Sequence, residues 1–408
     1  MGVVTSLGAG KEDNWARLTA GESGIRTVTR FPVDGLKSTM AGTVDFVSVD
    51  PVTSTGLTEQ LAKMATEEAL GQAAIGGKAD FPGPLFLAVA PVEVEWPQRL
   101  ALGRATGKTE FGYDDVLRIS GGGKFGEFHH RFMFGSVASH LAESFGTKGS
   151  PISLSTACAS GATAIQLGVE AIRRGEADAA LCVATDGSVN PEALVRFSLL
   201  SALSTQNDPP QAASKPFSKN RDGFVMAEGA GAMVLESYES ATARGAKILG
   251  VVAGCGELTD SFHRTRSSPD GKPIIGCMRN ALDDAGLTPD DIDYINAHGT
   301  GTPENDKMEC LCVSAVFGER AKQIPMSSNK SMIGHTLSAA GAVEAVVTLM
   351  TLEHQRIPPT INYNVPDPAI LLDVVPNVAR DAHMRRAISN SFGFGGQNAS
   401  LILTREPI

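Results

Sequence analysis

Two segments that are nearly free of charge and crowded with small side chains constrain the fold of this chain most. They cover residues 159–172 (ASGATAIQLGVEAI) and 336–352 (TLSAAGAVEAVVTLMTL). Helices of this composition are buried on all sides, and their small residues let backbones approach closely. Each segment follows a reactive side chain, Cys158 in one case and His335 in the other. The pattern indicates either a duplicated architecture that brings two equivalent helix starts together, or two unrelated core helices.

The rest of the chain predicts alternating strands and helices. Short apolar runs rich in β-branched residues predict strands, at residues 85–90, 179–184, 230–235, 249–253, 294–297 and 399–403. Apolar positions at helical spacing predict helices, around residues 57–65 and 273–285. No low-complexity tract separates two halves, so we expect a layered α/β protein.

Charge and composition exclude several classes of function. The net charge of −10 argues against a nucleic-acid partner, because neutralising phosphates requires a basic face. No apolar run is long enough to cross a bilayer, and the first residues lack the layout of a secretory signal. The six cysteines show no disulfide framework. We therefore expect no membrane partner, reduced thiols and a cytoplasmic location.

Cys158 has the sequence setting of a nucleophile. It lies between a strand-like run at residues 151–155 and the first small-residue segment, which predicts a strand-to-helix elbow. Such an elbow exposes a side chain, and the helix N-terminus stabilises a thiolate. The alternative is a buried structural cysteine, which is common in protein cores.

Two histidines and one glycine-rich loop occur in similar settings. His298 directly follows a predicted strand and is flanked by glycine, and His335 stands at the start of the second small-residue segment. Both positions suit an acid–base or hydrogen-bonding role, although a lone histidine is more often a satisfied core or surface group. The loop at residues 391–396 (SFGFGG) could offer backbone N–H groups to an oxyanion, or be an ordinary turn.

Four motifs taken together resemble a known family. They are Thr156-Ala-Cys-Ala-Ser-Gly, Ala297-His-Gly-Thr-Gly-Thr-Pro, Asn329-Lys with Gly334-His, and Asn390-Ser-Phe-Gly-Phe-Gly-Gly. They resemble the elongating β-ketoacyl-[acyl-carrier-protein] synthases, which are thiolase-fold condensing enzymes with a Cys-His-His set. The resemblance spans nearly the whole chain. It implies a thiolase-like, five-layered α-β-α-β-α duplication, with the nucleophile in residues 1–245 and both histidines in residues 246–408.

The resemblance also implies a reaction. The chain would be a 3-oxoacyl-[acyl-carrier-protein] synthase that extends a fatty acid by two carbons through decarboxylative Claisen condensation. Cys158 would carry the acyl chain, and its backbone N–H together with that of Phe394 would form the oxyanion hole. His298 and His335 would both donate hydrogen bonds to the enolate that malonyl thioester forms when it loses carbon dioxide.

Supporting roles follow from the same resemblance. Lys330 is expected to act structurally and electrostatically, paired with Glu309. Phe392 and Phe394 would form a gate. Substrate-binding positions match at Thr300, Thr302, Phe224 and Gly393.

Partners and bound groups are implied as well. Asn296, Glu344 and Asn390 match positions that surround a monovalent cation in some relatives. No other cofactor is expected, because the substrates are carried on the phosphopantetheine of an acyl carrier protein, the expected partner. The chain is expected to form a homodimer.

Other functions, within and outside this family, would differ from the expected one at identifiable residues or in their chemistry. A starter-type enzyme would have asparagine in place of His335, and a degradative thiolase would have a second catalytic cysteine. A non-catalytic, chain-length-determining partner subunit of a heterodimeric synthase would usually lack Cys158. A cysteine hydrolase would admit water to the site. The stretch from residue 89 to 132 matches the family poorly, so the resemblance leaves the acyl chain undefined.

Overall fold

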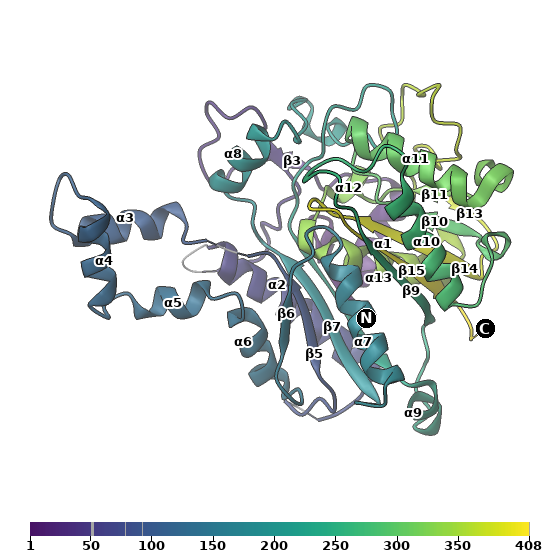
Figure 1. Ribbon diagram of the computed structural model, residues 1–408, viewed down its shortest axis with the longest axis horizontal. Coiled ribbons are helices and arrows are strands. Elements are labelled where there is room, and N and C mark those ends of the chain that lie inside the picture. The colour runs from purple at the N-terminus through teal and green to yellow at the C-terminus, as the bar shows by residue number, and fades with distance from the viewer. Residues whose placement is uncertain (50–52, 78, 92, 408) are drawn as a thin grey trace.

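The computed structural model describes residues 1–49, 53–77, 79–91 and 93–407 and is built around two main β-sheets (Figure 1). The six-stranded sheet has the order β2-β1-β8-β7-β5-β6. Its strands are β1 (Gly2–Thr5), β2 (Gly8–Ala9), β5 (Leu85–Val89), β6 (Ile152–Leu154), β7 (Ala179–Asp186) and β8 (Gly229–Glu236). The five-stranded sheet has the order β11-β10-β14-β15-β9. Its strands are β9 (Val251–Thr259), β10 (Tyr294–Asn296), β11 (Met326–Ser327), β14 (Arg386–Phe392) and β15 (Gln397–Thr404).

Helices complete five layers around these sheets. Helices α7 (Ser160–Arg173) and α13 (Ala340–His354) lie between the sheets and pack against strands of both. Helix α2 (Ser54–Ala73) covers the outer face of the first sheet. Helix α10 (Lys272–Asp284) covers the outer face of the second sheet, with α11 (Pro303–Phe317) beside it. The predicted α-β-α-β-α architecture is therefore confirmed.

The two small-residue segments form the middle layer and touch each other. A Cβ atom added to Gly161 would lie 2.4 Å from the backbone nitrogen of Ala342. A Cβ atom added to Gly341 would lie 2.4 Å from the backbone nitrogen of Ala162. Only glycine permits so close an approach from both sides. Of the two interpretations that the sequence left open, the paired, duplicated helix starts are correct.

Most predicted elements are present, but the central strand β14 was missed. The six predicted strands correspond to β5, β7, β8, β9, β10 and β15, and the two predicted helices to α2 and α10. Strand β14 was not predicted, because Ser389, Asn390 and Ser391 interrupt its apolar pattern although all three are buried. A central strand covered on both faces does not need the alternation on which such predictions depend.

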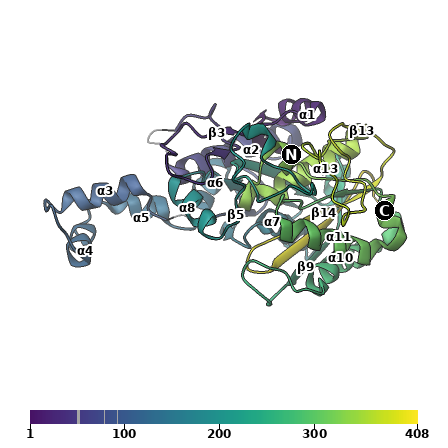
Figure 2. The ribbon, with the colours of Figure 1, turned by 90° about the horizontal axis from the view of Figure 1, so that it is seen from above.

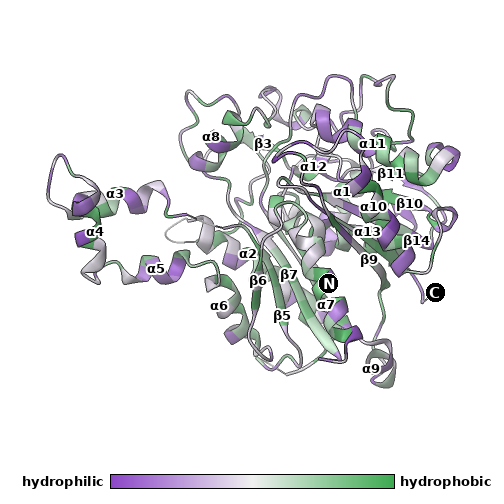
Figure 3. Cartoon of the chain, in the orientation of Figure 1, coloured by the Kyte–Doolittle hydropathy of each residue, from purple (hydrophilic) through white to green (hydrophobic). Residues whose placement is uncertain are grey.

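A helical arm projects from the body of the molecule. It comprises α3 (Trp96–Ala105), α4 (Tyr113–Gly121) and α5 (Gly126–Phe132), and it returns to the body through α6 (Ser136–Phe145). Both Figure 1 and Figure 2 show it extending away from the two sheets. Hydrophobic residues colour β5 and β7 almost throughout in Figure 3, whereas the arm is mixed. Large apolar side chains are nevertheless exposed on the arm and its return, namely Trp96, Phe111, Tyr113, Leu117, Met133 and Phe134.

No helix in the described part of the chain is both long and apolar enough to cross a membrane.

Candidate active site

Cys158 stands at the predicted elbow between β6 and α7. The preceding residue, Ala157, has φ of 51°, in the left-handed region that non-glycine residues rarely adopt. Ser160 holds the turn, because its hydroxyl accepts the N–H of Thr156 at 2.8 Å and donates to the carbonyl of Ala157 at 2.5 Å. The thiol is thereby placed beside the N-terminus of a buried helix, where negative charge is stabilised.

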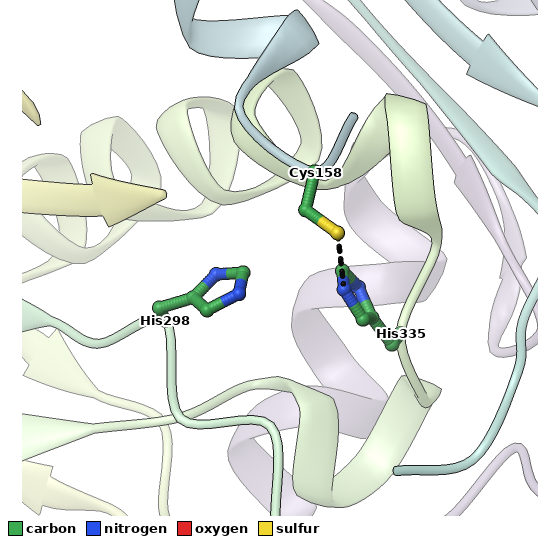
Figure 4. A group of neighbouring side chains, drawn as sticks. All are labelled: Cys158, His298 and His335. Carbon is green, nitrogen blue, oxygen red and sulfur yellow. Dashed lines mark hydrogen bonds between the residues drawn. The ribbon is translucent and has the colours of Figure 1, made fainter. Parts of the chain in front are cut away.

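Both predicted histidines meet this thiol. His298 follows β10, and His335 follows the short helix α12 (Lys330–Ile333). The Sγ atom of Cys158 lies 3.1 Å from Nε2 of His335 (Figure 4). One ring nitrogen of each histidine and the sulfur all lie within 4.8 Å of one another. Three residues from three separate parts of the sequence thus converge on one point.

Hydrogen bonds to Nδ1 fix the tautomers of the two imidazoles. The backbone N–H of Leu337 donates to Nδ1 of His335 at 3.3 Å. The ammonium of Lys330 donates to Nδ1 of His298 at 3.5 Å. Because Nδ1 accepts in both rings, each neutral ring carries its proton on Nε2. The site therefore presents two Nε2–H donors.

Burial keeps both rings neutral and the thiol protonated. Burial, reinforced by the charge of Lys330, holds the pKa of both His298 and His335 well below 6.5. Burial also raises the pKa of Cys158 to about 11. The charge of Lys330 and the nearby backbone N–H of Phe394 oppose this rise. At neutral pH the resting site is a thiol facing hydrogen-bond donors.

Lys330 pairs with Glu344, so the predicted pair with Glu309 is wrong. The Lys330 ammonium and the Glu344 carboxylate form a hydrogen-bonded ion pair with both side chains buried. Glu309 instead accepts the backbone N–H groups of His298 at 2.8 Å and Gly299 at 2.7 Å. Its position on α11, directly after the histidine loop, brings it to the backbone and not to the ammonium. Burial raises the pKa of each of the two carboxyls to about 7.

A cysteine and two histidines this close could also suggest a metal site, but their hydrogen bonds oppose it. A histidine that binds a metal through Nε2 normally donates its Nδ1–H to an acceptor. In this site Nδ1 of His298 and Nδ1 of His335 both face donors. The Nε2 lone pairs that a metal requires are therefore occupied by protons.

Asn296, Glu344 and Asn390, the residues matched to a monovalent-cation position, provide only part of a cation-binding site. Asn296 Oδ1 and Glu344 Oε2 are buried oxygens without a hydrogen-bond partner in the described structure. The Asn296 amide lies beside the α13 backbone, where its Nδ2 donates to Thr348 Oγ1 at 2.9 Å. Asn390 Oδ1 already accepts from Ser400 at 2.8 Å. Two free oxygen donors suit a hard cation.

Two cavities meet at Cys158. The larger, of about 500 Å³, is lined by His298 and His335 and by the remaining predicted binding residues, which are Thr300, Thr302, Phe224, Phe392, Gly393 and Phe394. The hydroxyls of Thr300 and Thr302 lie 2.9 Å apart along its wall. Arg264, Arg266 and Lys307 also line this cavity.

The smaller cavity, of about 270 Å³, is also lined by Cys158. It shares Phe197, Leu337 and Phe394 with the larger cavity, and these side chains therefore mark the junction. Neither His298 nor His335 lines it.

Sequence reasoning missed several groups that shape the site. It gave Glu344 no role towards Lys330, although Glu344 is the single charged residue of the apolar segment 336–352 and such a charge is a signal of a buried ion pair. It also missed Asp186, a buried carboxyl that accepts the N–H of Ser338 at 3.3 Å and lines the smaller cavity. Nothing in the sequence around Leu337 indicated that its N–H would set the tautomer of His335.

Family comparisons agree with this geometry. Residues 98–241 match the family "Beta-ketoacyl synthase, N-terminal domain", and residues 249–364 match "Beta-ketoacyl synthase, C-terminal domain". The ketoacyl synthase alpha subunit of the tetracenomycin polyketide synthase of Streptomyces glaucescens is 37% identical, over 99% of this chain and 96% of its own length. The 3-oxoacyl-[acyl-carrier-protein] synthase 2 of Vibrio cholerae is 38% identical, over 99% and 97%.

A solved structure is similar over the same extent. It is a type II polyketide ketosynthase in complex with its acyl-carrier protein and bound to a hexaketide, with 34% identity, a TM-score of 0.89, and coverage of 99% of this chain and 98% of that chain. Sequence, fold and site agree, and the chain belongs to the β-ketoacyl synthase family of condensing acyltransferases.

Proposed function

We propose that this chain joins an acyl group held on Cys158 to a malonyl unit held on an acyl carrier protein, with loss of carbon dioxide. The observation that carries the proposal is the position of the thiol at the junction of two cavities, of which only the larger contains the two Nε2–H donors. One cavity is then available to each substrate.

The first half-reaction loads the acyl group. The Cys158 sulfur attacks the thioester carbonyl, a new C–S bond forms, and the bond to the pantetheine sulfur breaks. The thiol proton passes to the departing pantetheine thiolate. The Phe394 N–H lies near the sulfur, and with the N–H of Cys158 it would stabilise the oxyanion. His335, 3.1 Å from the sulfur, would stabilise the thiolate as it forms.

The second half-reaction forms the carbon–carbon bond. Malonyl thioester enters the larger cavity, loses carbon dioxide, and leaves an enolate whose oxygen accepts from Nε2–H of His298 and His335. The enolate carbon attacks the acyl-Cys158 carbonyl, and the C–S bond breaks. The product is a 3-oxoacyl chain two carbons longer on the carrier, and the Cys158 thiolate released by C–S cleavage takes up a proton from solvent.

The larger cavity also suits the carrier arm. Thr300 and Thr302 would hold the pantetheine amides. Arg264 and Arg266 are exposed at the same wall, and neither forms an ion pair among the described residues. They would meet the phosphate of the arm and the acidic carrier, although the whole chain carries net charge −10. If a monovalent cation binds, Asn296 and Glu344 would hold it, and it would compensate buried negative charge.

The comparisons leave the acyl class open. Relatives named for fatty acid synthesis and for polyketide synthesis match equally well, at 38% and 37% identity. Similarity to relatives alone therefore does not favour a fatty acyl substrate, which the motifs suggested, over a polyketide substrate. The class of acyl chain is therefore inferred below from the side chains that line the smaller cavity, which is called the acyl chamber from here on.

Two copies of the chain would assemble through the arm and the edge of the first sheet. Strand β6 ends that sheet, and Ile152 on it is 45% exposed. Arm residues Tyr113 and Phe134 are exposed as well. An open strand edge beside apolar side chains favours pairing with an identical edge. Ile152→Arg should give monomers in sedimentation analysis, whereas Leu371→Asp, at an exposed apolar residue of the other half, should not.

We place the reaction in the cytoplasm, where six unpaired cysteines stay reduced.

The direct test is product formation. Purified protein is incubated with acyl-loaded and malonyl-loaded carrier protein, and the carrier is analysed by mass spectrometry for a 3-oxoacyl product. Cys158→Ala should form none. Elongation by Cys158→Ala would overturn the proposal, and release of free acid by the unaltered protein would point to a hydrolase.

A further inference from the structure

The acyl chamber has walls that do not suit a plain hydrocarbon. Its charged lining residues are Glu93, Glu95, Arg99, Asp186, Glu192 and Arg196. Glu93 lies 3.2 Å from Arg99 and 3.3 Å from Arg196, so one carboxylate meets both guanidinium groups. Within the described ranges, Glu95, Asp186 and Glu192 have no cationic partner. Three carboxyl groups therefore face the chamber with their charge uncompensated.

These carboxyls are held in place by the backbone. Glu95 is 8% exposed and accepts the N–H of Ser54 at 2.6 Å. Glu192 accepts the N–H of Trp96 at 2.6 Å. Burial raises the pKa of Glu95, and the charge of Glu192 adds to that rise. A carboxylate offers about four acceptor sites and no donor, so each has acceptor capacity left for a ligand.

The acyl chain has to occupy this chamber during condensation. The malonyl group and its carrier arm require the larger cavity, because both histidines line it. The chain on Cys158 must then lie on the other side of the sulfur. Phe197, Leu337 and Phe394 line both cavities, so the first carbons of the chain meet apolar side chains. Glu95 and Glu192 line only the chamber and meet more distant carbons.

We propose that the acyl chain extended here carries hydrogen-bond donors, hydroxyl or amino groups, beyond its first carbons, and that Glu95 and Glu192 recognise them. The inference rests on the proposed function and defines its acyl substrate. A saturated chain would strip water from the carboxylates and return no donor, which is costly. A chain ending in a carboxylate would be repelled. A hydroxyl or ammonium group supplies the missing donor, and a hydrogen bond to a charged group is among the stronger ones.

The test compares four acyl groups of matched length on the carrier protein: hexanoyl, 6-hydroxyhexanoyl, 6-aminohexanoyl and adipoyl. The rate of Cys158 acylation is followed by intact-protein mass spectrometry. At least one of the hydroxyl and amino groups should load about tenfold faster than hexanoyl, as expected for one hydrogen bond to a carboxylate. Adipoyl should load slowest. The faster of the two donor chains identifies which donor is recognised.

Variants assign the effect to the chamber. Glu192→Gln and Glu95→Gln should each bring the donor chain close to the hexanoyl rate, while Glu319→Gln, at a surface carboxylate remote from the site, should keep the preference. Two carboxylates are tested separately because Glu95 also supports the start of α2. Hexanoyl or adipoyl loading as fast as both donor chains would overturn this inference and leave the proposed function standing. Failure of all four groups to load would overturn the proposed function as well.

Discussion

Lys330 and Glu344 form a buried ion pair directly behind His298. The ammonium lies 3.5 Å from Nδ1 of the imidazole and is hydrogen-bonded to the Glu344 carboxylate, with both side chains almost fully buried. The pair thus joins the middle helix α13 to the reacting groups. It holds the proton of His298 on Nε2, where the substrate would lie.

Removing the ammonium should cost both stability and activity. Lys330→Met leaves the Glu344 carboxyl buried alone, with an expected loss of about 3–5 kcal/mol of unfolding free energy. Because the Lys330 charge lowers the pKa of Glu344, which is about 7 in the intact pair, the pKa in the variant should be higher, and this loss should grow as the pH rises above about 7. Chemical denaturation at several pH values measures it. Lys330→Met with Glu344→Gln should recover most of the stability but not the activity, since His298 still lacks its donor. Recovery of activity in the double variant would contradict the positioning role.

The thiol should behave as a poor nucleophile in the free enzyme. With its pKa raised to about 11, Cys158 gains about tenfold in thiolate per pH unit through the neutral and mildly alkaline range. Alkylation by iodoacetamide should therefore accelerate steadily up to about pH 10, where an ordinary thiol with a pKa of about 8.5 has levelled off. Lys330→Met should slow it at any fixed pH, because the Lys330 charge lowers this pKa. A plateau near neutral pH would show that Cys158 rests as a thiolate.

The contact between the middle helices should be intolerant of a single methyl group. Gly161→Ala and Gly341→Ala each place a Cβ atom 2.4 Å from a backbone nitrogen, so the helices must separate. We expect losses of several kcal/mol, at or above the roughly 1–3 kcal/mol typical of overpacking. Gly71→Ala, at an exposed position of α2 with nothing within 4 Å, is the matched control and should gain up to about 1 kcal/mol. Equal melting temperatures for all three variants would contradict the close crossing.

The two histidines should act without the thiol in the decarboxylation step. In Cys158→Gln, the side-chain amide resembles the acylated cysteine and the Nε2–H donors remain in place. This variant should release carbon dioxide from malonyl carrier protein without forming a condensation product. His298→Ala added to it should abolish gas release. Undiminished carbon dioxide release by that double variant would show that His298 is not needed for decarboxylation.

The sequence was most informative where local pattern and chemistry coincide. The helix starts beside Cys158 and His335 could be predicted because a small-residue composition permits one kind of packing, which Gly161 and Gly341 make possible. Strand β14 could not, since Ser389, Asn390 and Ser391 interrupt its apolar pattern although all three are buried, and Asn390 has its side-chain partners, Met278 and Ser400, outside the strand. The partner of Lys330 was misassigned for a related reason: the ion-pair partner of a buried charge is determined by the three-dimensional fold and not by a local sequence pattern. The acyl chamber combines residues near 95, 186 and 192, which only the fold brings together.

Acylation of Cys158 tests the central claim most directly. The protein is incubated with acyl-loaded carrier protein, its intact mass is measured, and the modified residue is located by peptide mapping. The account predicts a mass gain of one acyl group on Cys158, which malonyl carrier protein then removes as a longer 3-oxoacyl product. An unchanged mass with every acyl group tested, or an adduct on another cysteine, would contradict it.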